Sequence, residues 1–285
     1  MIGYQKLKNI VYTTTAYEHH TADVYLPEGA EDSPLVIAVH GGAFQAGSKE
    51  MYADWGPYLA SRGIAVMAVN YTLATPSRPS YPLIISEMDA AINFAVQNAG
   101  SWKIDPLKLG FMGDSAGAYL GAMAAFGNER SSAKIKFVVC AYGVMDIVDW
   151  AHYTNATRTD FVINKMFGCD PHTGKALYQQ ASPVCCIHEA VRSPLFDTSF
   201  FMIWGKADEI VLPEKQTVAF INLLKKLNIP HETYAVPNVG HFWFTKNDSE
   251  PENGMNSILK DDVAPRVAQY ITDTTCKVKK TDPNA

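Results

Sequence analysis

The 285-residue sequence has no block of like charge and no long apolar run. Its 24 Lys and Arg and 29 Asp and Glu residues are interspersed and give a formal net charge of −5. This distribution favours neither nucleic acid nor a membrane surface as a partner. The N-terminal stretch MIGYQKLKNIVYTTT lacks the apolar core of a signal peptide, and no stretch is long and apolar enough for a transmembrane helix. We therefore expect a cytoplasmic protein.

Cysteine is scarce, and its five residues form no C-x-x-C pair. They are Cys140, Cys169, Cys185, Cys186 and Cys276. An odd number of cysteines in a chain of this size indicates reduced thiols. The sequence also lacks H-E-x-x-H, clustered Cys and His, a P-loop, and G-x-G-x-x-G after a strand. We expect no metal and no cofactor, so the chemistry must come from side chains alone.

From the middle of the chain onward, strand-like apolar runs alternate with helical patterns. The expected strands are 35–39, 63–69, 107–112, 136–143, 199–204 and 231–236. Continuously apolar runs are typical of strands buried on both faces. The alternation predicts an α/β fold with a mostly parallel sheet flanked by helices. Two earlier runs, 9–15 and 21–27, have no helix between them and predict an antiparallel hairpin at one edge.

Helical periodicity is clearest in three later stretches, at 83–100, 212–230 and 263–272. Gly100 is expected to end the first helix and Pro213 to stand at the start of the second. Residues 146–194 interrupt the alternation and are long, aromatic and polar. We interpret them as a cap inserted within a single domain, 1–285, rather than as a separate domain. The polar tail, 277–285, is expected to be disordered.

The stretch LGFMGDSAGAYL contains a G-x-S-x-G motif around Ser115. The motif alone is common by chance. Here a short apolar strand leads into it and a helix of small and apolar residues leads out, which is the context that a serine nucleophile on a tight turn requires. The flanking residues must be tiny because the strand and helix backbones meet there. The pattern predicts Ser115 as the nucleophile.

A serine nucleophile needs a histidine base and an acid that orients it, in the chain order Ser, acid, His. Asp208 follows the penultimate predicted strand, and His241 follows the last one. The carboxyl ends of parallel strands gather functional residues in open α/β sheets. We therefore predict Asp208 and His241 as the partners of the serine, with Glu209 and Asp146 left open as alternatives for the acid.

The stretch AVHGGAF predicts a buried strand that leads into paired glycines. Glycines let the backbone approach a substrate without a side chain in the way. We predict that the N–H groups of Gly42, Ala43 and Ala116 form an oxyanion hole, with Gly41 as a further candidate. An ordinary Gly-Gly turn is the alternative. His40 is expected to brace the loop rather than transfer protons.

In this order, the motifs HGGAF, GDSAG, KADEIV and GHFW resemble those of the α/β-hydrolases. The stretches VNYTLA and IDPLKLG are similar to the esterase branch related to hormone-sensitive lipase and to bacterial feruloyl-esterase-like enzymes. The resemblance covers Ile10 to Thr272 and implies an α/β-hydrolase fold with a Ser-His-Asp triad. Ala43 replaces a third glycine, which places the chain nearer to the feruloyl-esterase-like and kynurenine-formamidase-like groups. Those groups have H-G-G-x-W, with Trp where Phe44 stands.

We predict a serine esterase that acts on small-molecule esters with short-chain or aromatic acyl groups. The alternatives are an amidase, such as an arylformamidase or a peptidase, and a non-catalytic ligand-binding protein on the same fold. Nothing in the sequence indicates an oligomeric state. Four aromatic residues near the motifs are predicted to line a substrate pocket, with core packing as the alternative for each: Phe44, Tyr119, Phe242 and Trp243.

Overall fold

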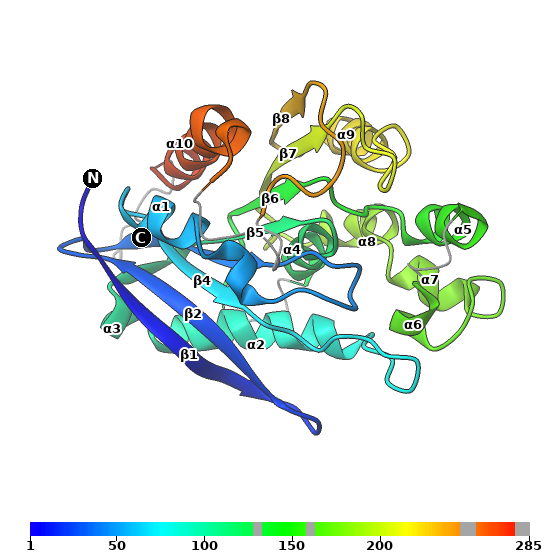
Figure 1. Ribbon diagram of the computed structural model, residues 1–285, viewed down its shortest axis with the longest axis horizontal. Coiled ribbons are helices and arrows are strands. Elements are labelled where there is room, and N and C mark those ends of the chain that lie inside the picture. Colours follow the sequence, from blue (N-terminus) through cyan, green and yellow to red (C-terminus); the bar gives the residue numbers. More distant parts are fainter. Residues whose placement is uncertain (128–132, 158–162, 246–254, 277–285) are drawn as a thin grey trace.

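A twisted eight-stranded sheet organises the chain, with helices on both of its faces (Figure 1). The computed structural model describes residues 1–127, 133–157, 163–245 and 255–276. The strand order is β1-β2-β4-β3-β5-β6-β7-β8, and β3 to β8 run parallel to one another. The strands are β1 Tyr4–Thr14, β2 His19–Pro27, β3 Ser33–Val39, β4 Ala65–Val69, β5 Ile104–Asp114, β6 Phe137–Ala141, β7 Ser199–Gly205 and β8 His231–Val236. The predicted α/β fold with a mostly parallel sheet is confirmed.

The predicted edge hairpin is also confirmed. β1 pairs with β2 antiparallel, and β2 pairs antiparallel with β4, so the hairpin forms one edge of the sheet. In the central strand β3, successive side chains enter opposite layers of the core. Leu35, Ile37 and Val39 pack in one apolar cluster, and Val36 and Ala38 pack in the other. A strand buried on both faces therefore reads as one continuous apolar run.

The helices complete these two layers. Within the described ranges they are α1 Trp55–Ala60, α2 Leu83–Gln97, α3 Ala99–Trp102, α4 Ala116–Phe126, α5 Ile147–Thr157, α6 Asn164–Phe167, α7 Lys175–Gln180, α8 Pro183–Ala190, α9 Thr217–Lys226 and α10 Ala264–Cys276, with a 3₁₀ turn η1 Lys49–Tyr52 and a π turn η2 Leu259–Val263. Apolar side chains of α2, α4 and α9 share one cluster, and those of α1 and α10 share the other. The sheet is thus covered on both faces.

Two predicted helix ends are wrong. α2 ends at Gln97, and Gly100 lies inside α3 instead of ending a helix. The left-handed residue that ends α3 is Lys103, with φ 55°. α9 begins at Thr217 rather than at Pro213, because Pro213 belongs to a preceding turn whose carbonyl oxygen accepts the N–H of Val218 at 2.8 Å.

The chain between β6 and β7 forms the helices α5 to α8. In Figure 1, α5, α6 and α7 lie together at the right-hand end of the molecule. α8 packs against α4, and α5 packs against α7. The interpretation of 146–194 as a cap within one domain stays a prediction. Residues 158–162 of this segment and the tail 277–285 lie outside the described residues.

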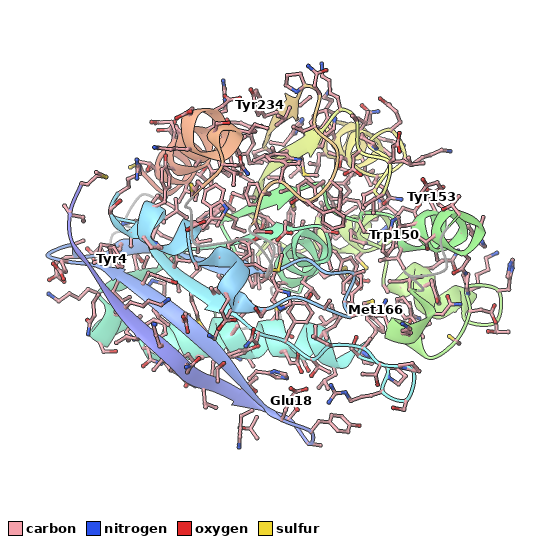
Figure 2. The ribbon with its side chains drawn as sticks, in the orientation of Figure 1. Tyr4, Glu18, Trp150, Tyr153, Met166 and Tyr234 are labelled. Atoms are coloured by element: carbon pink, nitrogen blue, oxygen red, sulfur yellow. The ribbon has the colours of Figure 1, made fainter. Side chains whose placement is uncertain are left out.

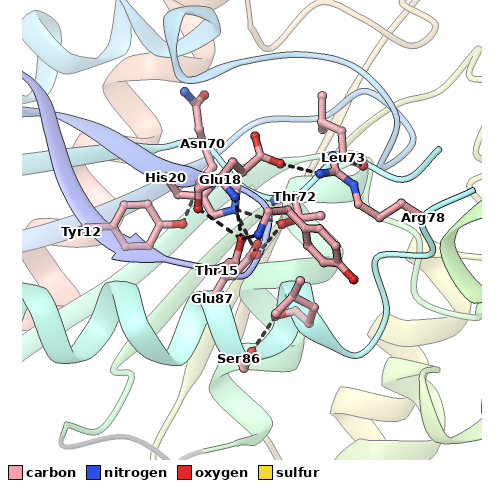
Figure 3. A network of polar contacts seen from close by, with 12 residues as sticks. Tyr12, Thr15, Glu18, His20, Asn70, Thr72, Leu73, Arg78, Ser86 and Glu87 are labelled. Atoms are coloured by element: carbon pink, nitrogen blue, oxygen red, sulfur yellow. Dashed lines mark hydrogen bonds and ion pairs between the residues drawn. The ribbon is translucent and has the colours of Figure 1, made fainter.

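A buried polar network fastens the hairpin to the segment that joins β4 to α2 (Figure 3). Nε2 of His20 lies 3.1 Å from Oε1 of Glu87 and 2.9 Å from Oγ1 of Thr72. Thr72 donates its hydroxyl and its N–H to Glu87, at 2.5 and 2.9 Å. Burial opposes the charge on Glu87, but the hydrogen bonds from His20 and Thr72 outweigh burial and lower the pKa of the carboxyl. The network anchors Thr72, and so it also holds the preceding residue, Tyr71, in place.

Candidate active site

Ser115 stands on a sharp turn between β5 and α4. Its φ of 50° and ψ of −113° lie in a region that residues with a side chain rarely adopt. A Cβ on Gly113 would lie 2.2 Å from a backbone atom of Gly117, and a Cβ on Gly117 would lie 1.8 Å from the carbonyl oxygen of Val39. Neither position has room for a side chain. The requirement for tiny neighbours, inferred from the sequence, therefore has a direct steric cause.

The three residues predicted as a triad lie together. Nε2 of His241 is 3.0 Å from Oγ of Ser115, and Nδ1 of His241 is 2.7 Å from Oδ2 of Asp208. The side chains of His241 and Asp208 are 2% and 0% exposed. A carboxylate accepts hydrogen bonds, so Nδ1 holds the proton and the lone pair of Nε2 faces the serine hydroxyl. This geometry suits removal of the serine proton by the imidazole.

Asp208 is held in place by its own turn. Oδ1 accepts the N–H groups of Ile210 and Val211, each at 2.9 Å, and this leaves Oδ2 for His241. These two hydrogen bonds fix the orientation of the carboxylate. Both carboxylate oxygens of Asp208 thus have fixed partners in the absence of substrate.

The two alternative acids point elsewhere. Glu209 is exposed, although it is next to Asp208 in the chain. Oδ1 of Asp146 accepts the N–H of Asp149 at 3.0 Å, at the start of α5. Of the three candidate acids, Asp208 is the one whose carboxylate is hydrogen-bonded to His241.

The structure adds residues around the triad that the sequence reasoning missed. Tyr153 and Trp150, labelled in Figure 2, project from α5 and donate to the turn that follows Asp208. The Tyr153 hydroxyl donates to the carbonyl oxygen of Glu209 at 2.7 Å, and the Trp150 indole donates to that of Ile210 at 3.0 Å. The helix α5 thus satisfies carbonyl groups of this turn, while the Asp208 carboxylate satisfies its N–H groups. Contacts across 60 residues leave no local signal in the sequence.

Tyr142 was also missed. It has a φ of 40° directly after β6, and its ring centroid lies 4.4 Å from that of His241. Its hydroxyl oxygen accepts the N–H of Phe244 at 3.1 Å, in the loop that contains the histidine. The one available signal was its place at the carboxyl end of a parallel strand.

The predicted oxyanion loop follows β3 and has strained backbone. Gly42, Ala43 and Phe44 have φ values of 107°, 51° and 64°. Gly41, the further candidate donor, donates its N–H to Oδ1 of Asp114 at 3.1 Å, which argues against it as an oxyanion donor. A second strong interaction of the same N–H with a substrate oxygen would require this bond to break. The predicted donors are thereby reduced to Gly42, Ala43 and Ala116.

Nothing in the described part of the chain accepts a hydrogen bond from the N–H groups of these three residues. Ala116 is the first residue of α4, where helical N–H groups have no partner within the helix. The helix dipole also favours negative charge at this end. Gly42, Ala43 and Ala116 therefore remain the predicted oxyanion donors.

His40 braces the oxyanion loop, as predicted. Burial lowers the pKa of its imidazole to about 4, so the ring is neutral near pH 7. Nδ1 lies 2.7 Å from the carbonyl oxygen of Gly41, to which the neutral ring donates. The Tyr71 ring stacks on His40 at 4.4 Å, and its hydroxyl donates to the His40 carbonyl oxygen at 3.0 Å. The start of the loop is thus held by hydrogen bonds from the His40 ring and from the Tyr71 hydroxyl.

The four aromatic candidates have different surroundings. Phe44 and Tyr119 are fully buried and make an edge-to-face contact at 5.2 Å. Trp243 is 6% exposed and packs in the apolar cluster on the α1 and α10 face of the sheet. Phe242 is 47% exposed, and its ring stands edge-on to His241 at 4.6 Å. Of the four, Phe242 is the one with an exposed surface beside the histidine.

A separate cavity of about 1090 Å³ lies between α2, α4 and α8. Its described lining includes Tyr81, Met123, Phe126 and Cys186, and none of the three predicted triad residues is part of it. This cavity is therefore distinct from the surroundings of Ser115.

In the ranges listed above, no group of three or more His, Cys, Asp or Glu side chains is arranged to hold a metal ion. No described helix is long and apolar enough to cross a membrane. No disulfide bond joins any of the five cysteines, all of which lie in the described ranges.

The sheet order, the turn at Ser115 and the carboxyl-end placement of the three residues define an α/β-hydrolase fold. The family model BD-FAE matches residues 22–224, and the chain belongs to this family.

Curated relatives and solved structures are similar to the chain. Esterase LipQ of Mycobacterium tuberculosis is 25% identical over an alignment of length 269, and the match covers 84% of this chain and 61% of LipQ. An acetyl esterase of Salmonella paratyphi B is 32% identical over 112 residues, which are 39% of this chain and 34% of that enzyme. The matches thus span less than two thirds of the length of these relatives.

Among solved structures, a truncated carbohydrate esterase from gut microbiota superposes with a TM-score of 0.73 at 23% identity, covering 96% of this chain and 97% of that one. Esterase B of Lactobacillus rhamnosis superposes with a TM-score of 0.74 at 18% identity, covering 98% and 89%. At these identities the two likenesses establish the fold.

Proposed function

We propose that the chain hydrolyses carboxylic esters of small molecules through an acyl-enzyme formed on Ser115. The observation that carries the proposal is the hydrogen-bonded series from Ser115 through His241 to Asp208. The N–H groups of Ala43, in the loop after β3, and of Ala116, the residue after the serine, have no acceptor among the residues that the structure describes, which supports the proposal. The names of the relatives, an esterase and an acetyl esterase, point to the same chemistry.

The reaction follows from the positions of the donors and acceptors. Ser115 Oγ attacks the ester carbonyl carbon while Nε2 of His241 takes the hydroxyl proton. The carbonyl oxygen becomes an oxyanion, and the N–H groups of Gly42, Ala43 and Ala116 stabilise it. His241 then protonates the departing alcohol, and Asp208 stabilises the imidazolium between the two transfers. Water, deprotonated by the same nitrogen, attacks the acyl-enzyme and releases the acid.

We further propose that residues 146–194 form a cap and that the acyl group is short or aromatic. The exposed face of Phe242 suits a compact or flat group beside the histidine. The acetyl esterase among the relatives also fits a short acyl group. We also propose a cytoplasmic location and a small-molecule substrate. Cysteines that form no disulfide bond with one another are consistent with a reducing compartment.

The test is turnover of p-nitrophenyl acetate by purified wild type and Ser115→Ala. We expect the variant to fold and to lose about four to six orders of magnitude in turnover, since triad residues act as a unit. More than about a tenth of wild-type activity in the variant would refute the nucleophile. A matched ester and amide pair, assayed side by side, separates an esterase from an amidase, and faster turnover of the amide would favour the latter.

A further inference from the structure

The carboxylate of Asp114 joins three loops around the nucleophile, although no step of the proposed reaction uses it. Oδ1 accepts the N–H of Gly41, in the oxyanion loop, at 3.1 Å and the hydroxyl of Tyr52 at 3.0 Å. Oδ2 accepts the hydroxyl of Thr245 at 3.2 Å, four residues after the histidine. Asp114 itself precedes Ser115 in the chain. The Asp114 side chain thus contacts both the oxyanion loop, through Gly41, and the loop that contains His241, through Thr245.

This side chain is 2% exposed. Burial raises the pKa of Asp114 to about 6, although hydrogen bonds from Tyr52, Thr245 and Gly41 lower it. A buried carboxylate is unfavourable unless its oxygens are well satisfied. The three donors meet that condition and fix the side chain in one position.

The Gly41 residue is held at both of its polar groups. Its N–H donates to Asp114, and its carbonyl oxygen accepts from Nδ1 of His40 at 2.7 Å. In a trans peptide the C=O and the next N–H point in opposite directions. The N–H of Gly42 is therefore directed away from His40. A Cβ on Gly41 would lie 2.5 Å from Oδ2 of Asp114, so the close approach depends on glycine.

We propose that Asp114 is a positioning residue that holds the oxyanion loop and the histidine loop against the nucleophile turn. The inference rests on the proposed function. The loop needs such a hold because Ala43 and Phe44 have left-handed φ values of 51° and 64°, which cost energy in residues with side chains. Without the bond to Gly41, these residues can relax, and the N–H of Ala43 changes its direction.

The experiment compares Asp114→Ala with Asp114→Asn. The asparagine can keep Oδ1 as acceptor for Gly41 and Tyr52, and its NH₂ can donate to the hydroxyl oxygen of Thr245. The asparagine therefore removes the charge and preserves the hold, whereas alanine removes both. Turnover is expressed per active serine, titrated with a fluorophosphonate, so that a loss of folded protein does not lower it.

For Asp114→Ala we expect kcat per titrated site to fall about 100-fold, the range seen when an oxyanion donor is lost, with KM within about threefold. The affinity for an aryl trifluoromethyl ketone, whose adduct carries an oxyanion, should weaken in the same proportion. For Asp114→Asn we expect kcat within about fivefold of wild type.

The matched control is Asp23→Asn, which alters another buried carboxylate, paired with Lys49 on the hairpin side of the sheet. It should lower the melting temperature and leave kcat per titrated site unchanged. If Asp114→Ala does not fold, Thr245→Val tests the same hold at its other end, with an expected loss of about tenfold in kcat.

Two outcomes would overturn the inference. One is a kcat for Asp114→Ala, or for Thr245→Val in its place, within about threefold of wild type. The other is an Asp114→Asn variant as slow as the alanine variant, which would assign the effect to charge. Ser115→Ala, measured in parallel, separates the claims, because retained turnover there overturns the proposed function itself.

Discussion

Nδ1 of His241 lies 2.7 Å from Oδ2 of Asp208, whereas the neighbouring Glu209 is exposed. Adjacent carboxylates in one turn therefore have different surroundings. Asp208→Asn should lower turnover by about 10⁴, because the amide no longer holds the imidazole in the tautomer that accepts the serine proton. Glu209→Gln should cost less than about threefold. Steady-state kinetics on p-nitrophenyl acetate compare the two, and a reversed ranking would move the acid to Glu209.

Tyr153 contacts the turn that follows Asp208, which predicts that the segment between β6 and β7 supports catalysis without touching the substrate. Tyr153→Phe removes the donor to the Glu209 carbonyl oxygen, 2.7 Å away, and keeps the ring. We expect kcat to fall about three- to tenfold with KM nearly unchanged, since the turn that fixes Asp208 loses one of its supports.

The control is Tyr17→Phe, because Tyr17 lies on the exposed hairpin turn. Equal kcat values for wild type, Tyr153→Phe and Tyr17→Phe would contradict a role of α5 in positioning the acid.

The raised pKa of Asp114 predicts how stability depends on pH. The carboxyl has a pKa of about 6 in the folded state against its ordinary value of 3.8, so between these two pH values the folded protein binds more protons than the unfolded one. The free energy of unfolding therefore falls as the pH rises from 3.8 to about 6. Asp114→Asn does not titrate at this position and should gain about 2 kcal/mol relative to wild type between pH 4 and pH 8.

Urea unfolding of wild type and Asp114→Asn at pH 4 and at pH 8 gives the free energy of unfolding of each protein. The difference between the two proteins at pH 8 is then compared with the difference at pH 4. The groups that face Asp114 are Tyr52, Tyr71, Tyr142 and His241. Burial raises the pKa of each tyrosine well above its usual value, so the three phenols stay neutral. Because imidazoles titrate in the same range, the comparison is repeated in a His241→Gln background. A difference that does not change with pH would refute the raised pKa.

The exposed Phe242 ring beside the histidine predicts a preference for short acyl chains. Turnover of p-nitrophenyl esters should peak at acetate or butyrate and decline through octanoate to palmitate. A long chain is favoured when each buried CH₂ contributes about 0.8 kcal/mol, which requires an apolar channel. Rates are measured below micelle-forming concentrations, and turnover that rises steadily to palmitate would indicate a lipase.

The order Ser115, Asp208, His241 could be predicted because a parallel sheet brings its carboxyl ends to one edge. Each of the three residues follows a recognisable apolar strand, so three short local patterns were sufficient to predict that they lie close together. The glycines beside Ser115 were predictable for the same reason, since the turn allows no other residue.

The supports of the site were not predictable. Asp114 was read as part of a motif, yet its partners Tyr52 and Thr245 are 62 and 131 residues away in the chain. Gly41 looked like a further oxyanion donor because nothing in the sequence shows that its N–H is already bonded. Gly100 was expected to end a helix, but the left-handed residue is Lys103. Long-range hydrogen bonds and single backbone dihedrals leave no periodic trace.

The contact between Gly117 and the carbonyl oxygen of Val39, where an added Cβ would lie 1.8 Å away, belongs to the scaffold rather than to the reaction. A descendant of this chain that lost Ser115 would still need glycine at 113 and 117, because the strand and helix would still touch. The two glycines in such a motif therefore indicate the fold, whereas the serine indicates the reaction. A combinatorial library that seeks new reactions on this turn should hold Gly113 and Gly117 constant and vary Asp114, Ser115 and Ala116.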